Sequence, residues 1–147
     1  MNLTIRTSSA AVVLEGPFPL LVTPWSEDAK LDITVLIKEA EYVNAAGAGG
    51  VVWPPSAETN ELERTDEYAA GLMALAERSV KKGAEFTARF TAVCSGDVAA
   101  DGVRRAALIE SVAKKTGAKM AILARPPDDA ANQVMMADYY RALAKVT

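Results

Sequence analysis

Amphipathic segments alternate with short apolar runs along the chain. Apolar side chains recur at helical spacing over residues 32–46, 64–82, 101–115 and 132–146, so each of these segments predicts a helix that buries one face. Asp32 stands at the start of the first segment, where its carboxylate is a good N-cap. The side chains that we expect to point inward are Leu36, Ala40 and Val43; Tyr68, Leu72, Leu75 and Ala76; Leu108 and Val112; and Met136, Tyr140 and Leu143.

The apolar runs predict strands. They occupy residues 18–23, 47–53, 86–93 and 117–124, and each run precedes a predicted helix. Runs that are apolar at nearly every position are typical of parallel strands, because helices cover both faces of such a sheet. The order along the chain is therefore strand then helix, repeated four times.

A Gly-Ala pair marks the points at which a helix gives way to a strand. These pairs begin at Gly47, Gly83 and Gly117, which are spaced by 36 and then 34 residues. A glycine just beyond the last turn of a helix commonly adopts the left-handed conformation that ends the helix. A repeat of this length, made of helix, glycine and strand, indicates βα units.

This order predicts an α/β fold with a parallel sheet. We expect a single β/α domain over residues 1–147, in which residues 1–15 form an N-terminal arm or a short first strand. Two architectures fit, an open doubly wound sheet or a (β/α)8 TIM barrel, of which four βα units would be half. Both architectures place functional residues at the carboxyl ends of the strands.

Composition narrows the classes of function. The formal net charge is −3, and the basic clusters are short pairs such as Arg104-Arg105 and Lys114-Lys115, which we expect on solvated helix surfaces. Nucleic-acid or anionic-membrane binding needs larger basic clusters, so neither is expected. The chain has no histidine, which excludes Ser-His-Asp and Cys-His catalysis and disfavours zinc. A lone cysteine, Cys94, and the absence of a signal peptide or of an apolar run of about 18 residues predict a cytoplasmic protein.

Polar side chains follow every predicted strand, and a parallel topology brings these strand ends to one rim. The rim residues are Thr23, Ser56, Glu58, Cys94, Ser95, Asp97, Arg125, Asp128 and Asp129. Ser56 and the N–H groups that follow it are suited to a carboxylate or phosphate, or else Ser56 and Glu58 are loop or capping residues. Arg125 is either a clamp for an acidic substrate or the ion-pair partner of Asp128 or Asp129.

The remaining questions are whether the chain has a reactive thiol, a metal site or a bound cofactor. Cys94 is either a reactive thiol or a buried, inert one. Asp97, Asp128 and Asp129 have the oxygen ligands that a hard cation prefers, although their spacing specifies no metal site. The sequence contains neither Gly-x-Gly-x-x-Gly nor a Walker motif, so no cofactor is expected.

The stretch GPFPLLVTPWSEDAK, continued to Gly71, resembles the opening of the dihydrodipicolinate synthase and N-acetylneuraminate lyase family. There a strand ends in Thr-Pro-aromatic, an aspartate begins the next helix, and a second strand leads into Gly-Thr-Thr-Gly-Glu. The matching residues here are Thr23, Pro24, Trp25, Asp32, Gly47, Gly50, Glu58, Leu62 and Glu67. The stretches KKTGAKMAILARPP and MADYYRALAKVT resemble later parts of the family, so the resemblance covers residues 16–147.

The resemblance implies a (β/α)8 barrel of which this chain supplies the N-terminal half. It also implies a carbon–carbon lyase or synthase that joins pyruvate or another 2-oxo acid to a lysine as a Schiff base, because the imine acts as an electron sink. Ser56 stands at the place of the second threonine, where the family holds the substrate carboxylate. Thr23 and Glu58 belong to the same substrate-binding set, with Glu58 supporting the loop, and Arg125 is expected to bind a second acidic group.

The sequence departs from the family pattern at three places. Pro55 replaces the first threonine, and Pro127 and Asp128 replace the tyrosines of Pro-Tyr-Tyr, one of which relays protons. The Schiff-base lysine of the family belongs to a sixth strand, and no residue of this chain takes its place. The catalytic residues are therefore unassigned.

Two principal hypotheses follow. The first is a truncated or divergent 2-oxo-acid lyase or synthase that acts on a 2-oxo acid or sugar acid without a cofactor. The alternative is a catalytically inactive half-barrel or pseudoenzyme that acts through self-association or ligand binding. Both predict a homo-oligomer. A third hypothesis, an open-sheet binder of phosphate or another small molecule, is disfavoured because the chain lacks a Gly-rich loop.

Overall fold

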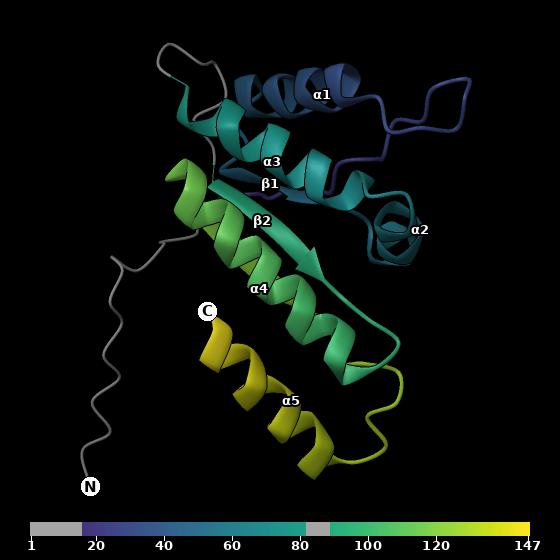
Figure 1. Cartoon of the computed structure of the whole chain (residues 1–147). Helices are drawn as coiled ribbons and strands as arrows, with labels where there is room; N and C mark the ends of the chain where they lie inside the picture. The colour runs from purple at the N-terminus through teal and green to yellow at the C-terminus, as the bar shows by residue number, and fades with distance from the viewer. Residues whose placement is uncertain (1–15, 82–88) are drawn as a thin grey trace, which may run out of the picture.

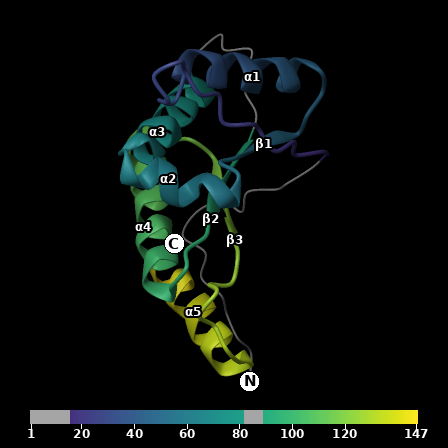
Figure 2. The same ribbon diagram turned by 90° about the vertical axis from the view of Figure 1, so that its right-hand side faces the viewer.

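Three parallel strands form one layer of the molecule, and the helices lie against it (Figure 1 and Figure 2). A computed structural model describes residues 16–81 and 89–147, with the side chains of residues 89–91 outside the description. The strands are β1 (Gly50–Trp53), β2 (Arg89–Cys94) and β3 (Met120–Ala124), in the order β1-β2-β3. The predicted parallel α/β class is confirmed, and the start of the third predicted strand, at residues 86–88, lies outside the described residues.

The first predicted strand lies beside β1 but is paired only over a short stretch. The Gly49 and Val52 N–H groups donate to the carbonyls of Pro17 and Pro19, both at 2.9 Å, and the Leu21 N–H donates to the Val52 carbonyl at 2.9 Å. This is the hydrogen-bond pattern of a parallel neighbour. Proline has no N–H, so Pro17 and Pro19 accept from Gly49 and Val52 but cannot donate to β1, which limits the pairing.

The helices lie close to the predicted ranges. They are α1 (Ile33–Ala45), α2 (Thr59–Arg64), α3 (Glu67–Val80), α4 (Ala99–Thr116) and α5 (Gln133–Val146), with the 3-10 turn η1 (Ser56–Glu58) before α2. Asp32 caps α1 by accepting from the Val35 N–H at 3.0 Å, as predicted. Gly47 and Gly117 have the expected positive φ angles, whereas Gly83 lies outside the described residues. Within the described part of the chain, no helix is long and apolar enough to cross a membrane.

Among residues 16–81 and 89–147, the helices cover one face of the sheet and leave the other, here called the bare face, uncovered (Figure 2). Burial alternates along residues 20–23: Leu21 and Thr23 are each 2 % exposed, whereas Leu20 is 55 % and Val22 65 % exposed. On β3, Leu123 is 52 % exposed on the same bare face. Parallel sheets are normally covered on both faces, so this exposed apolar surface is unusual.

The core between β1 and α3 is built around Trp53. Its ring stacks on Tyr68 with centroids 6.3 Å apart, and the Tyr68 hydroxyl donates to the Val93 carbonyl at 2.8 Å. Gly71 of α3 lies against the indole, and an added Cβ there would come within 2.3 Å of a Trp53 ring carbon. The close approach of α3 to the sheet therefore depends on a residue without a side chain.

The second predicted helix, 64–82, is wrong at its start. A short helix, α2, ends at Arg64, and the chain turns at Thr65 and Asp66, whose φ is +60°, before α3 begins at Glu67. The Thr65 hydroxyl donates to the Glu67 carboxylate at 2.7 Å, and the Leu31 N–H donates to the same carboxylate at 2.7 Å. These side-chain bonds stabilise a turn that apolar periodicity does not reveal.

The inward face of the last helix is also corrected. Tyr140 was expected to point inward, but it is 42 % exposed, and its neighbour Tyr139 is buried at 2 % exposure. Tyr139 lies against Gly102 of α4, where an added Cβ would stand 2.4 Å from the tyrosine oxygen. Gly102 has no side chain and leaves room for the Tyr139 ring, so Tyr139 is buried and Tyr140 is exposed.

We expect Gly71→Ala to lower the free energy of unfolding by about 1–3 kcal/mol, the usual cost of overpacking. The added methyl group must displace Trp53 or move α3 from β1. Urea unfolding followed by tryptophan fluorescence measures the change. Replacing an exposed glycine in a helix by alanine normally raises the free energy of unfolding by about 1 kcal/mol. Such an increase for Gly71→Ala would contradict the packing described here.

Candidate functional site

A pocket of about 330 Å³ opens at the carboxyl ends of the strands. It draws residues from all four predicted strands or the turns that follow them, and its lining is Leu20, Ser56, Val93, Leu123, Ala124, Arg125 and Pro126. Most of this lining is apolar, with a hydroxyl and a guanidinium as its polar groups. A pocket with a few placed polar groups on an apolar floor is suited to a small organic acid.

Ser56 is presented to this pocket by the turn after β1. It is the first residue of η1 and is exposed. Its carbonyl accepts from the Ser95 hydroxyl at 3.3 Å, so the turn after β1 is bonded to the segment after β2. The preceding Pro55 supplies no N–H, which leaves the Ser56 hydroxyl and the later N–H groups as the available donors.

Arg125 comes to the pocket from the end of β3. Its N–H donates to the Cys94 carbonyl at 3.2 Å, and its guanidinium pairs with Asp128 at 3.0 Å. The two side chains are 49 % and 67 % exposed. An exposed pair is worth at most about 1 kcal/mol, so a ligand carboxylate can displace Asp128 from Arg125. The predicted ion pair with Asp128 is present, and the predicted role of Arg125 as a clamp for an acidic substrate stays a prediction.

Thr23 and Glu58 do not line the pocket. Thr23 is buried because it follows Leu21 toward the helix layer, and its hydroxyl has no hydrogen-bond partner among the described residues. Glu58 is half-buried in η1, with one carboxylate oxygen buried and likewise unpartnered within the described part. Neither residue therefore contacts the pocket, and the predicted support of the loop by Glu58 stays a prediction.

Cys94 is buried and lies behind the rim. Its thiol donates to the Gly102 carbonyl at 2.8 Å, and burial raises the pKa of the thiol. Both features disfavour the thiolate, so the inert alternative holds. Asp97, Asp128 and Asp129 do not form a metal site, since no group of three potential ligands gathers among the described residues.

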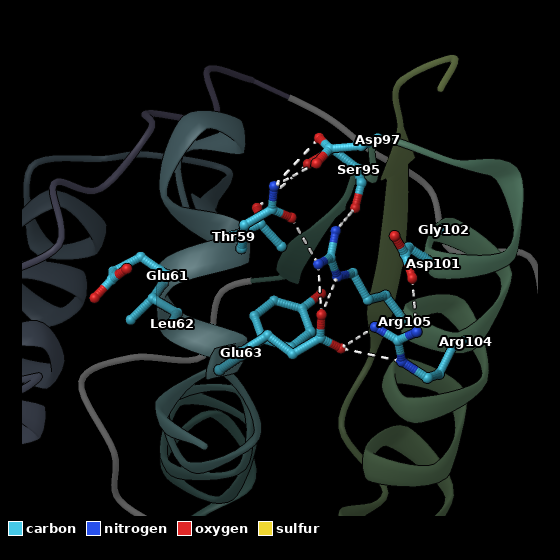
Figure 3. Close-up of polar contacts among 12 residues, drawn as sticks. Thr59, Glu61, Leu62, Glu63, Ser95, Asp97, Asp101, Gly102, Arg104 and Arg105 are labelled. Carbon is cyan, nitrogen blue, oxygen red and sulfur yellow. Dashed lines mark hydrogen bonds and ion pairs between the residues drawn. The ribbon is translucent and has the colours of Figure 1, made fainter. Parts of the chain in front are cut away.

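One of the described arginines, Arg105, is buried behind this rim. Arg105 was expected on a solvated helix surface, but it is 2 % exposed and lies between α4 and α2 (Figure 3). It pairs with Glu63 and donates to the Asn60 side-chain oxygen at 2.8 Å and to the Ser95 carbonyl. A buried arginine needs such partners, and the pair Arg104-Arg105 alone does not indicate them.

Glu63 lies between two arginines. Burial raises the pKa of this carboxyl group, but hydrogen bonds and charges from Arg104 and Arg105 outweigh burial and hold the pKa below 4.5. The carboxylate therefore remains ionised at neutral pH. It links the inner, buried Arg105 to the outer Arg104, which is 57 % exposed and also pairs with Asp101.

The comparisons with known proteins identify the fold. No family model matches the chain, and no curated protein matches it. Among solved structures, dihydrodipicolinate synthase from Aquifex aeolicus is similar with a TM-score of 0.71 and 16% identity, over 90% of this chain and 42% of that chain. N-acetylneuraminate lyase from Proteus mirabilis is similar with a TM-score of 0.71 and 15% identity, over 90% of this chain and 42% of that one.

A third solved structure is similar over nearly the same share of this chain. YagE, an Escherichia coli prophage protein of the dihydrodipicolinic acid synthase family solved in complex with pyruvate, has a TM-score of 0.69 and 16% identity, over 92% of this chain and 43% of that one. The chain thus has the fold of part of these enzymes and spans less than half of their length. The predicted family resemblance is confirmed at the level of fold.

We expect Glu63→Gln to lower the free energy of unfolding at pH 7 by about 1.5–3 kcal/mol, the range for hydrogen bonds to charged groups. Because the Glu63 pKa is lower in the folded state, this contribution is present above about pH 4.5 and is lost as the pH falls through the folded pKa. Urea unfolding at a series of pH values measures it. Glu61→Gln is the control, since Glu61 pairs with the exposed Arg64 and should change stability much less. If the difference in the free energy of unfolding between wild type and Glu63→Gln does not shrink below pH 4.5, the ionised Glu63 carboxylate is not the source of this stability.

Proposed function

We propose that the rim pocket binds the carboxylate of a small 2-oxo acid or sugar acid, as the substrate-binding part of an aldolase-type carbon–carbon lyase or synthase. The observation that carries this proposal is that Ser56 and Arg125, which follow different strands, line the same pocket. A hydroxyl and a guanidinium are the groups that hold a carboxylate.

The rest of the pocket fits the carbon skeleton of such an acid. Leu20, Val93 and Leu123 supply apolar surface beside the polar groups. The volume of about 330 Å³ is at the small end of ligand sites, which favours a compact ligand. The part-barrel likeness to dihydrodipicolinate synthase and N-acetylneuraminate lyase structures, one of them holding pyruvate, supports the same class of substrate.

The proposal separates acid binding from covalent catalysis. Imine formation needs a lysine amine within reach of the bound 2-oxo acid. No lysine lines the pocket in the described part of the chain. We therefore assign acid binding to this chain, and expect imine chemistry only where an assembly brings a lysine to this rim.

Titration with pyruvate is expected to shift the backbone amide resonances of the segments around Ser56 and Arg125. Arg125→Gln should weaken binding about tenfold or more, because one hydrogen bond to a charged group is worth about 1.5–3 kcal/mol. Arg141→Gln is the matched control, because Arg141 also forms an exposed pair with an aspartate three residues away, Asp138, but does not line the pocket.

The outcomes of this titration are distinct. Saturable shifts confined to the pocket, weakened by Arg125→Gln and not by Arg141→Gln, support acid binding. No response to pyruvate or to sugar acids from the folded protein would reject it. Borohydride reduction in the presence of pyruvate, read by intact mass, shows separately whether a lysine of this chain forms an imine.

A second candidate function is self-association through the bare face of the sheet. Leu20, Val22 and Leu123 are each more than half exposed on this face. Among the described strands, β3 is at the edge of the sheet and has unpaired backbone groups. Such an edge and an apolar face are typical features of a surface that another chain covers. This candidate corresponds to the non-catalytic half-barrel hypothesis.

Self-association predicts that Val22→Glu shifts the protein toward the monomer, because a carboxylate on the bare face would be buried without a partner. Light scattering coupled to size-exclusion chromatography measures the mass. Val134→Glu is the control, since Val134 is equally exposed, at 68 % against 65 %, but lies on α5. A wild-type protein that is monomeric at tens of micromolar would reject this candidate.

A further inference from the structure

A connected set of polar side chains lies between α2 and α4 (Figure 3). It joins α2, the segment after β2 and α4, which are distant in sequence. Its centre is Arg105, the buried arginine of α4. These side chains line a second, open pocket of about 560 Å³, and their donors and acceptors bond to one another.

Arg105 contacts two segments at once. Its guanidinium donates to the Glu63 carboxylate and to the Asn60 side-chain oxygen on α2, and to the backbone carbonyl of Ser95 after β2. A planar guanidinium with donors on several sides can serve these three acceptors together, which a lysine ammonium cannot match. Arg105 therefore sets the distance between α2 and the segment after β2.

Ser95 extends this linkage to the pocket. Its hydroxyl donates to the Ser56 carbonyl at 3.3 Å and lies at the same distance from the Thr59 hydroxyl oxygen. The Thr59 hydroxyl donates in turn to the Pro55 carbonyl at 3.4 Å. The path from Arg105 to the acid-binding serine thus passes through a single residue, Ser95.

The turn that carries Ser56 has few other supports. Neither η1 nor α2 has a side-chain cap at its start. Ser56 and Ala57 are exposed, so apolar packing does not fix them. Within the turn, the Glu58 N–H donates to the Pro55 carbonyl at 3.0 Å, and the Thr59 N–H donates to the Ser56 carbonyl. The Ser95 hydroxyl is the side-chain donor that ties Ser56 to the segment after β2, so the position of the turn relative to that segment depends on this bond.

We propose that Arg105 is a positioning residue for the acid-binding pocket, acting through Ser95 to hold Ser56 in place. This inference rests on the proposed function, because it concerns the residue that binds the carboxylate. It assigns the buried arginine a role in ligand affinity in addition to any role in stability. Displacement of a binding group by about 1 Å is enough to weaken its contact strongly.

Arg104 provides a matched comparison. It precedes Arg105 on the same helix and also pairs with Glu63, but it is 57 % exposed and bonds to Asp101 instead of Ser95 or Asn60. Arg104→Lys therefore changes the same chemical group next to the same carboxylate without touching the path to Ser56. Arg105→Lys keeps the charge but removes the planar fork.

The experiment measures pyruvate affinity in wild type, Arg105→Lys, Arg104→Lys and Ser95→Ala, each alone and combined with Ser56→Ala. Arg105→Lys and Ser95→Ala should each weaken binding about fivefold to tenfold, and Arg104→Lys less than twofold. In the Ser56→Ala background, Arg105→Lys should have no further effect, because its effect passes through Ser56. An equal loss in both backgrounds would indicate a general structural role and would overturn the proposal.

Amide hydrogen exchange at residues 56–59 gives a readout that needs no ligand. Exchange there should be at least fivefold faster in Arg105→Lys and Ser95→Ala than in wild type or Arg104→Lys; unchanged exchange would overturn the proposal. If Arg105→Lys does not fold, Ser95→Ala alone decides the matter, since it removes only one hydroxyl. If wild type binds no acid, the proposed function fails, while the exchange comparison still shows whether Arg105 holds the turn.

Discussion

The parallel arrangement of the strands is the constraint on which the rest of this molecule depends. Parallel strands cannot be joined by tight hairpins. Each connection therefore runs back along one face of the sheet, here as a helix, and the next strand begins at the same end of the sheet as the strand before it. All the segments that follow strands therefore meet at one rim, which brings Ser56 and Arg125 to one pocket although 69 positions separate them in sequence. Without that shared direction, the same side chains would be scattered.

The one-sided helix layer gives the molecule two unlike faces. On the covered face, Trp53, Tyr68 and Gly71 pack closely, and small changes there are expected to affect the whole core. On the bare face, Leu20, Val22 and Leu123 are apolar and each more than half exposed. The pocket opens at the edge of that bare face, so a partner that covers the sheet would also enclose the ligand.

The ionic side chains of Arg105 and Glu63 form hydrogen bonds that apolar side chains could not form at this place. The segments after β1 and β2 are short and partly exposed, and burying them in hydrocarbon would leave their carbonyls without donors. Arg105 supplies a donor to the Ser95 carbonyl, and Glu63 compensates its charge. A buried pair of this kind adds little net stability compared with apolar packing, but it fixes one relative position of the segments it joins.

The sequence by itself determined the local elements, because periodicity and caps are local properties. Asp32 and Asn132 mark helix starts, the glycines at 47 and 117 mark ends, and parallel topology then predicted which residues share the rim. Only the tertiary structure decided which polar groups are buried. Arg105 is buried because Glu63, 42 positions away, meets it, and Tyr139 is buried in place of Tyr140 because Gly102 leaves room for its ring. Such choices depend on contacts between distant segments, which no local pattern encodes.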